Sequence, residues 1–247
     1  MFNLIKMDLY RLFRQKSFYF VGLTITFFVG ITVFSLAMAI DYGMYDNLSS
    51  SGISIATVFD MTRGDSTFPM IMAIGAIIFT NADFSSGYIK NIASNVKNKM
   101  VIPLSKFIVS SLASLIYIVW MVIIITVMSF IMFDNVSLGN ASDLILGMLL
   151  YLFFVMNMLA LVIGLCMLLR NSAGSITILV CIVLFAGLIY AAIDYLVSID
   201  LTPYSTVGNL TKFTVDSKEL PTMMLSALVG LIGYNAVGAI AMQKKDI

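Results

Sequence analysis

The sequence contains no histidine and few charged residues of either sign. Aspartate, glutamate, lysine and arginine make up only 11% of the 247 residues, whereas about a quarter is usual in a soluble domain. With 60% hydrophobic residues, the chain cannot cover a water-exposed surface. We therefore expect an integral membrane protein that forms a single membrane domain over residues 1–247. The lack of histidine also removes the commonest general base and metal ligand.

Cysteine is scarce, and the motifs of several enzyme classes are missing. Cys166 and Cys181 lie in apolar runs without the spacing of a zinc or redox site, so we expect free, buried thiols. The sequence has no GxxxxGK[ST] phosphate-binding loop, no GxSxG and no HExxH. We therefore expect no enzyme activity, metal or cofactor in this chain.

Six long apolar runs are candidate membrane spans. About 20 apolar residues in a helix cross a hydrocarbon core of about 30 Å, and the runs cover about residues 17–40, 68–82, 107–133, 144–169, 173–193 and 221–242. None contains a charged residue, which disfavours an ion-coupled carrier. The first run is too long for the core of a signal peptide, and the short second run is expected to continue as helix past Ala82. The predicted fold class is an all-α polytopic membrane protein with six transmembrane helices.

The basic residues are distributed unevenly between the two sides of these spans. With a cytoplasmic amino terminus, all but three of the 14 lysines and arginines lie inside, the exceptions being Arg63, Lys212 and Lys218. The positive-inside rule therefore predicts that both termini are cytoplasmic, as an even number of spans requires. The outer segments 41–67 and 194–220 are long enough for short helices or re-entrant pieces.

The first 16 residues have the pattern of an amphipathic helix. Apolar residues recur at helical spacing, opposite a polar set made of Lys6, Asp8, Arg11 and Arg14, and Lys16 follows. The pattern predicts an interfacial helix whose basic face meets anionic headgroups. A simple basic flank that sets the topology is the alternative.

One amide lies in the middle of the fourth run. Asn157 interrupts an apolar stretch, and an amide at this depth can form a hydrogen bond between helices. We expect Asn157 either to pack helices together or to line a substrate path.

The segment between the second and third runs is polar and is predicted to be cytoplasmic. Its sequence, Asp83-Phe84-Ser85-Ser86-Gly87-Tyr88-Ile89-Lys90-Asn91, resembles the acidic-aromatic-x-x-Gly-x-x-x-Asn segment in permease subunits of type 2 ATP-binding-cassette exporters. The resemblance is greatest to permeases of low-GC Gram-positive bacteria that move antimicrobial or toxic peptides. Leu104-Ser105-Lys106 and the layout of the spans fit the same pattern. Many relatives have glutamate at the position of Asp83 and arginine near Lys97 or Lys99. The present sequence keeps the charge at these positions, but a lysine cannot form the bidentate hydrogen bonds of an arginine.

In that family the segment is a coupling helix that docks into a groove on a separate ATPase. The resemblance implies this role for the following residues: Asp83, Phe84, Gly87, Tyr88, Ile89, Lys90, Asn91, Lys97 and Lys99. Lysines would meet acidic residues of the partner, and an apolar anchor would come from Phe84, Tyr88, Ile89 and Ile92. An ordinary basic cytoplasmic loop is the alternative.

The expected function follows from this resemblance. The chain would be the membrane subunit of an exporter in the cell membrane, moving amphipathic or hydrophobic peptides out of the cytoplasm or membrane. Its partners would be two copies of the ATPase, which bind ATP and magnesium, a second permease chain, identical or related, the lipid bilayer and the peptide. No nucleic acid is expected. The alternative is a non-transporting immunity or assembly factor that binds a toxin or a partner protein.

Overall fold

The computed structural model describes residues 2–44, 53–96, 98–133, 135–197, 201–215 and 217–244. Six of its helices are long and apolar enough to cross a membrane. They are α2 (Lys16–Asp41), α5 (Thr67–Ser85), α7 (Val101–Met132), α8 (Ala141–Leu169), α9 (Ser172–Val197) and α11 (Leu220–Lys244). The predicted all-α class and the six apolar spans are therefore confirmed, and the fold is that of a multi-pass membrane protein.

Helices α5 and α7 extend beyond the expected spans into the polar segment between them. α5 continues three residues beyond Ala82, as predicted, and α7 begins at Val101, six residues before the expected boundary. The helices therefore extend beyond the apolar runs and include charged residues such as Asp83 and Lys106, while the runs themselves contain no charge. An apolar run ends at the first charge, whereas the backbone hydrogen bonds of a helix can continue through charged residues.

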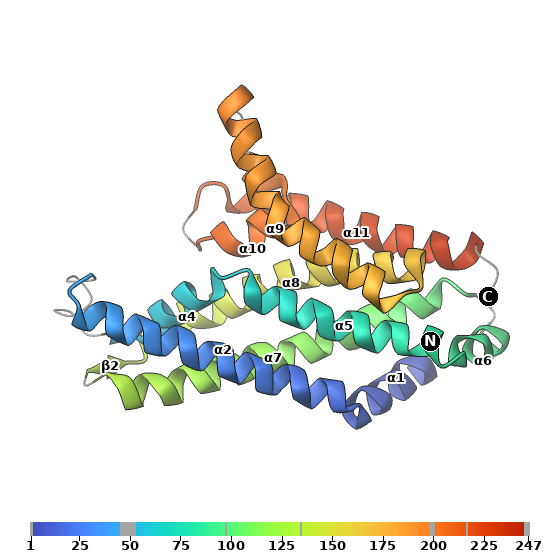
Figure 1. Cartoon of the computed structure of the whole chain (residues 1–247), viewed down its shortest axis with the longest axis horizontal. Helices are drawn as coiled ribbons and strands as arrows, with labels where there is room; N and C mark the ends of the chain where they lie inside the picture. Colours follow the sequence, from blue (N-terminus) through green and yellow to red (C-terminus); the bar gives the residue numbers. More distant parts are fainter. Residues whose placement is uncertain are drawn as a thin grey trace.

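Two short helices lie at one end of the bundle. α1 (Phe2–Arg14) meets α2 at an elbow around Gln15, and α6 (Tyr88–Asn95) lies between α5 and α7. Figure 1 shows both chain termini at the same end as α1 and α6. We call this the α6 end.

The remaining short elements lie toward the other end of the bundle. They are strand β1 (Ile53–Ser54), α4 (Ile55–Arg63), strand β2 (Val136–Ser137), the 3-10 helix η1 (Thr202–Tyr204) and α10 (Thr206–Lys212). β1 and β2 pair in parallel, with Ile53 opposite Val136. The short helices agree with the expectation for segments 41–67 and 194–220. We call this the α4 end (Figure 1).

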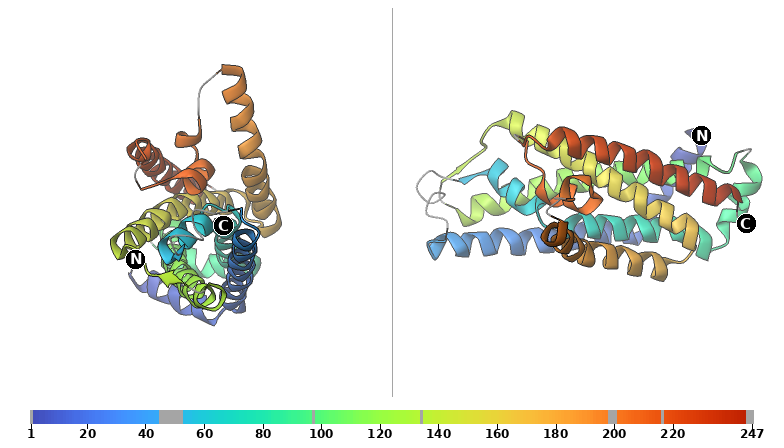
Figure 2. Two further views of the ribbon diagram at one scale, coloured as in Figure 1. Left: turned by 90° about the vertical axis from the view of Figure 1, so that its left-hand side faces the viewer. Right: turned by 90° about the horizontal axis from the view of Figure 1, so that it is seen from above.

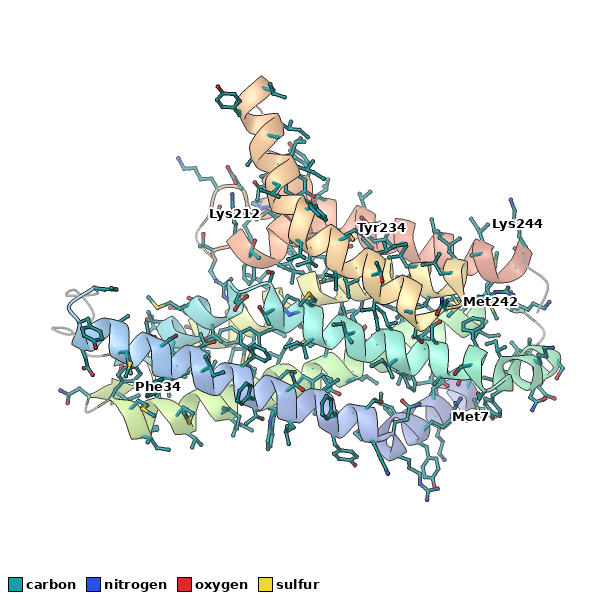
Figure 3. All side chains as sticks on the ribbon, in the orientation of Figure 1. Met7, Phe34, Lys212, Tyr234, Met242 and Lys244 are labelled. Carbon is teal, nitrogen blue, oxygen red and sulfur yellow. The ribbon has the colours of Figure 1, made fainter. Side chains whose placement is uncertain are left out.

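The six long helices are not equally buried. In the most apolar window of each, 61% of the residues of α5 and α8 are buried, against 17% for α2 and α11 and 11% for α9. α8 packs closely on α11, since a Cβ atom added to Gly164 would lie 3.0 Å from the carbonyl oxygen of Tyr234. α5 and α8 thus form the centre, while apolar side chains such as Phe34 on α2 point outward (Figure 3).

Helix α9 leans away from the other helices. Its first half packs against the bundle through buried Ser175, Leu179 and Val183. Its second half projects outward, as Figure 1 and the left-hand view of Figure 2 show, and leaves Leu188 and Leu196 67% and 77% exposed. Lipid or another protein chain must cover this part of the helix in a membrane.

Candidate functional site

Four charged side chains from three helices meet at the α6 end. Lys106 Nζ on α7 donates a hydrogen bond to Asp8 Oδ1 on α1 at 2.7 Å and pairs with Asp83 Oδ2 on α5 at 2.6 Å. Arg11 on α1 bonds the other carboxylate oxygen of Asp83. Asp8, Asp83 and Lys106 are at most 1% exposed. We call these four residues the charge cluster.

The charge cluster is balanced, with two carboxylates facing two cations. The hydroxyl of Ser105 donates to the second oxygen of Asp8 at 2.7 Å, and Arg11 Nη1 lies 4.0 Å from Asp8 Oδ1. Buried charges are costly unless they are paired and hydrogen-bonded. Because each charge has an opposite partner within the chain, the cluster can be buried, but removing one member leaves a buried charge uncompensated.

Aromatic rings link this cluster to α6. Lys106 Nζ lies 4.3 Å from the centre of the Phe79 ring, and the Arg11 guanidinium lies 4.6 Å from that of Tyr88. Such cation–π contacts are stabilising, more so when desolvated. The Tyr88 hydroxyl also donates to Met7 Sδ on α1 at 3.3 Å, and Met7 is labelled in Figure 3. Helices α1, α5, α6 and α7 are therefore joined by one set of contacts.

The helix α6 turns a polar side outward. Gly87 precedes it with φ of 70°, a left-handed conformation that favours glycine, and this lets the chain turn sharply between α5 and α6. Ile89 and Ile92 are each 5% exposed and belong to the hydrophobic core. Lys90 and Asn91 are exposed. The surface of α6 open to a partner is thus polar and basic.

The structure corrects one part of the expected coupling segment. Because Ile89 and Ile92 pack into the chain's own core, they cannot be the apolar anchor for a partner. Asp83 is likewise engaged inside the chain. Half-buried Phe84 lies under the guanidinium of Arg170, 5.8 Å from the ring centre. Two further lysines were assigned to this segment: Lys99 is half-buried, and Lys97 lies outside the described residues. The coupling role itself remains a prediction.

The predicted helix at the amino terminus is present, but its polar residues are divided between two surroundings. Lys6, Arg14 and Lys16 are exposed, while Arg11 and Asp8 turn into the charge cluster. The expectation of one basic face is therefore wrong for Asp8, which faces α7, and for Arg11, which lies one turn later and faces α5. That α1 lies in the membrane interface remains a prediction.

Sequence reasoning missed the pairing of Asp8 with Lys106. The two residues are 98 positions apart, so local periodicity cannot connect them. A weak signal was present in the sequence, because Asp8 is an acid in a strongly basic helix and Lys106 directly precedes a long apolar run. Charges in such places need partners.

The structure places Asn157 between three helices. It is 2% exposed on α8, and its Nδ2 lies 3.4 Å from the hydroxyl of Thr206 on α10. The same hydroxyl lies 3.3 Å from that of Tyr234 on α11, a residue labelled in Figure 3. Asn157 Oδ1 is buried and has no hydrogen-bond partner among the described residues, and the choice between helix packing and a substrate path stays a prediction.

A second buried cation lies at the α4 end. Arg63 is 3% exposed. Its Nε donates to Asp60 Oδ1 at 2.6 Å, and its Nη1 donates to the carbonyl oxygen of Phe213 at 2.9 Å. The guanidinium also lies 3.7 Å from the centre of the Phe213 ring. Arg63 thus ties α4 to the segment that follows α10, beside an open polar cavity of about 520 Å³.

Fold and site together define an α-helical multi-pass membrane protein with a buried charge cluster beneath a short polar helix. Within the described ranges, no three His, Cys, Asp or Glu side chains are arranged to hold a metal ion. No protein-family model and no curated protein matches the sequence. The resemblance to exporter permeases therefore rests on residues 83–91, on residues 104–106 and on the layout of the spans.

Proposed function

We propose that this chain is the membrane-spanning subunit of an ATP-driven exporter and that α6 is the surface on which a separate ATPase acts. The observation that carries the proposal is the construction of α6. Its outer side, with Lys90 and Asn91, is exposed and polar, while Tyr88 at its first turn contacts Arg11 of the charge cluster. A partner that binds the outer side therefore acts on a helix fixed to three others.

The contacts under α6 suit the transmission of a displacement. α6 follows α5 after only Ser86 and Gly87, and the charge cluster joins both to α1 and α7. Packed, ion-paired elements shift as units rather than deform continuously. A push on α6 would therefore move the ends of α1, α5 and α7 together, which is how access to a path between two permease chains would change.

The exposed side chains of α6 also limit how a partner protein could bind it. With Ile89 and Ile92 buried, binding would depend on polar and electrostatic contacts through Lys90, Asn91, Lys99 and, in the segment outside the described residues, Lys97. Such contacts weaken as salt is raised. The partner surface would be acidic, and ATP and magnesium would bind on that partner.

The proposed cargo is an amphipathic or hydrophobic peptide, moved out of the cytoplasm or membrane across the cell membrane of a low-GC Gram-positive bacterium. The cargo, the cytoplasmic orientation of the α6 end and the second permease chain all come from the resemblance and from the distribution of basic residues. The charge-free middle parts of the six helices are compatible with apolar cargo.

Site-directed photo-crosslinking in the native host tests the proposal. A photoreactive amino acid at Lys90 is expected to capture a protein that contains a phosphate-binding loop for ATP. The same amino acid at exposed Asp143, which is near the α4 end, should not capture it. An immunity or assembly factor would instead give a partner without a nucleotide-binding motif, or none at all, and either result would reject the exporter.

A charge reversal provides the functional counterpart. Lys90→Glu is expected to abolish both the cross-link and export of the peptide while leaving the amount of folded protein unchanged, since Lys90 is exposed. Normal ATP-dependent export by Lys90→Glu would show that the ATPase does not act through this side of α6.

A further inference from the structure

The elbow between α1 and α2 carries two cations that the charge cluster does not use. Arg14 and Lys16 are both exposed. Arg14 donates to the hydroxyl of Tyr10 at 2.9 Å, and neither cation forms an ion pair with any residue that the structure describes. Within α1, Asp8 and Arg11 are neutralised inside the chain, whereas Lys6 is exposed as well. At the elbow, Arg14 and Lys16 are left to meet an anion from outside.

The amino terminus of α2 adds to the positive potential at this elbow. Gln15 occupies the cap position, and its side chain makes no capping hydrogen bond. The first N–H groups of a helix favour an anion. Three carbonyl groups near the end of α1 have partners, because the Gln15 N–H bonds those of Arg11 and Leu12 and the Tyr19 hydroxyl donates to that of Phe13.

An apolar groove begins next to these groups. It lies between α2 and α7 and has a volume of about 560 Å³, which is in the range of small-molecule sites. Tyr19 lines it near the elbow, and Trp120, whose Nε1 donates to Thr26 Oγ1 at 2.9 Å, lines it farther along. Thr26 lies seven residues after Tyr19, which corresponds to about 10 Å of helix. Gly22 lies between them and leaves space.

We propose that the elbow and the groove together form a binding site for an anionic phospholipid. The phosphate would lie at Arg14 and Lys16, and one acyl chain would occupy the groove between α2 and α7. Charge complementarity selects this occupant, because the cations lie at the start of a spanning helix, where lipid phosphates lie, and the apolar groove continues from there into the membrane. The site does not depend on the proposed transport function.

Native mass spectrometry of the purified full chain tests the headgroup contacts. The protein is titrated in detergent with phosphatidylglycerol or with phosphatidylcholine carrying the same acyl chains. We expect phosphatidylglycerol to bind about tenfold more tightly, and the double variant R14Q/K16Q to lose this preference. Lys244→Gln, which removes an exposed cation at the end of α11, is the matched control and should change nothing. Equal binding of both lipids to the unmodified chain would overturn the proposal.

A second pair of variants tests the groove. Gly22→Leu places a side chain in it, and the nearest atom to the new Cβ is 3.9 Å away, so the helix tolerates the change. We expect binding of both lipids to fall about tenfold. Gly233→Leu, at an exposed glycine of α11 with open space around it, is the control. If Gly22→Leu leaves lipid binding intact, or lowers the association of two chains instead, the groove is not an acyl-chain site.

Discussion

The two ends of the bundle hold their buried cations in different ways. At the α6 end, Lys106 has two carboxylate partners that are themselves buried, and the four charges of the charge cluster cancel within the chain. At the α4 end, Arg63 shares its charge with the side chain of Asp60, which is 53% exposed, and with a carbonyl group and an aromatic ring. In the first site both carboxylates and Lys106 are buried, only Arg11 is partly exposed, and the contacts join helices into a unit. The second remains partly open, so water can replace its acidic partner.

The largest effect is expected from removing the buried cation at the α6 end. Lys106→Met leaves Asp8 and Asp83 with only Arg11, and breaking a buried ion pair in this way costs about 3–5 kcal/mol. The free energy of unfolding, measured with SDS in mixed micelles, should fall by this amount. Lys99→Met, which removes a half-buried lysine outside the charge cluster, is the control and should change it by less than about 1 kcal/mol.

Restoring the balance of charge sharpens this test. Adding Asp83→Asn to Lys106→Met leaves one acid and one base, Asp8 and Arg11, whose charged atoms lie 4.0 Å apart. The double variant should recover at least about 1 kcal/mol of the loss, since residues in one network are not additive. If the two losses simply add, charge balance is not what stabilises the α6 end.

A smaller effect is expected at the open site. Arg63→Lys keeps the charge but cannot reach both Asp60 and the carbonyl oxygen of Phe213 with the geometry of a guanidinium. Unfolding free energy should fall by about 1–3 kcal/mol, the cost of leaving one buried polar group unsatisfied. Cross-linking from position 90 should be unchanged, because Arg63 lies at the other end. A loss of that cross-link would show that the two ends are coupled.

The smallest effect is expected from the exposed acid of that site. Asp60→Asn removes a carboxylate that water already solvates, so the loss should be less than about 1 kcal/mol and should disappear in high salt. The free energy of unfolding of Asp60→Asn and of Arg63→Lys, each measured at low and at high salt, checks this expectation. A loss as large as that of Lys106→Met would mean that the site at the α4 end is as buried as that at the α6 end.

Local pattern was enough to predict most of the fold, because apolar runs and helical periodicity are local properties. They gave the six spans and α1, and the shortness of the second run correctly indicated that α5 extends past Ala82. Local pattern cannot connect Asp8 with Lys106, because ion pairing between distant segments is decided by packing. The local pattern of residues 88–95 does indicate an apolar side with Ile89 and Ile92. That the chain's own core covers this side is decided by packing, which local pattern cannot predict.

The uneven burial of the spans has a consequence for how the protein enters the membrane. α9, the least buried of the six, has the highest mean hydropathy, and α5, one of the two most buried, has the lowest. A segment rich in apolar side chains partitions into lipid by itself, whereas a more polar one is inserted poorly alone. α9 is thus equipped to be inserted on its own during synthesis, while α5 depends on the helices that it packs against, α2 before it in the chain and α8 after it, to remain in the bilayer.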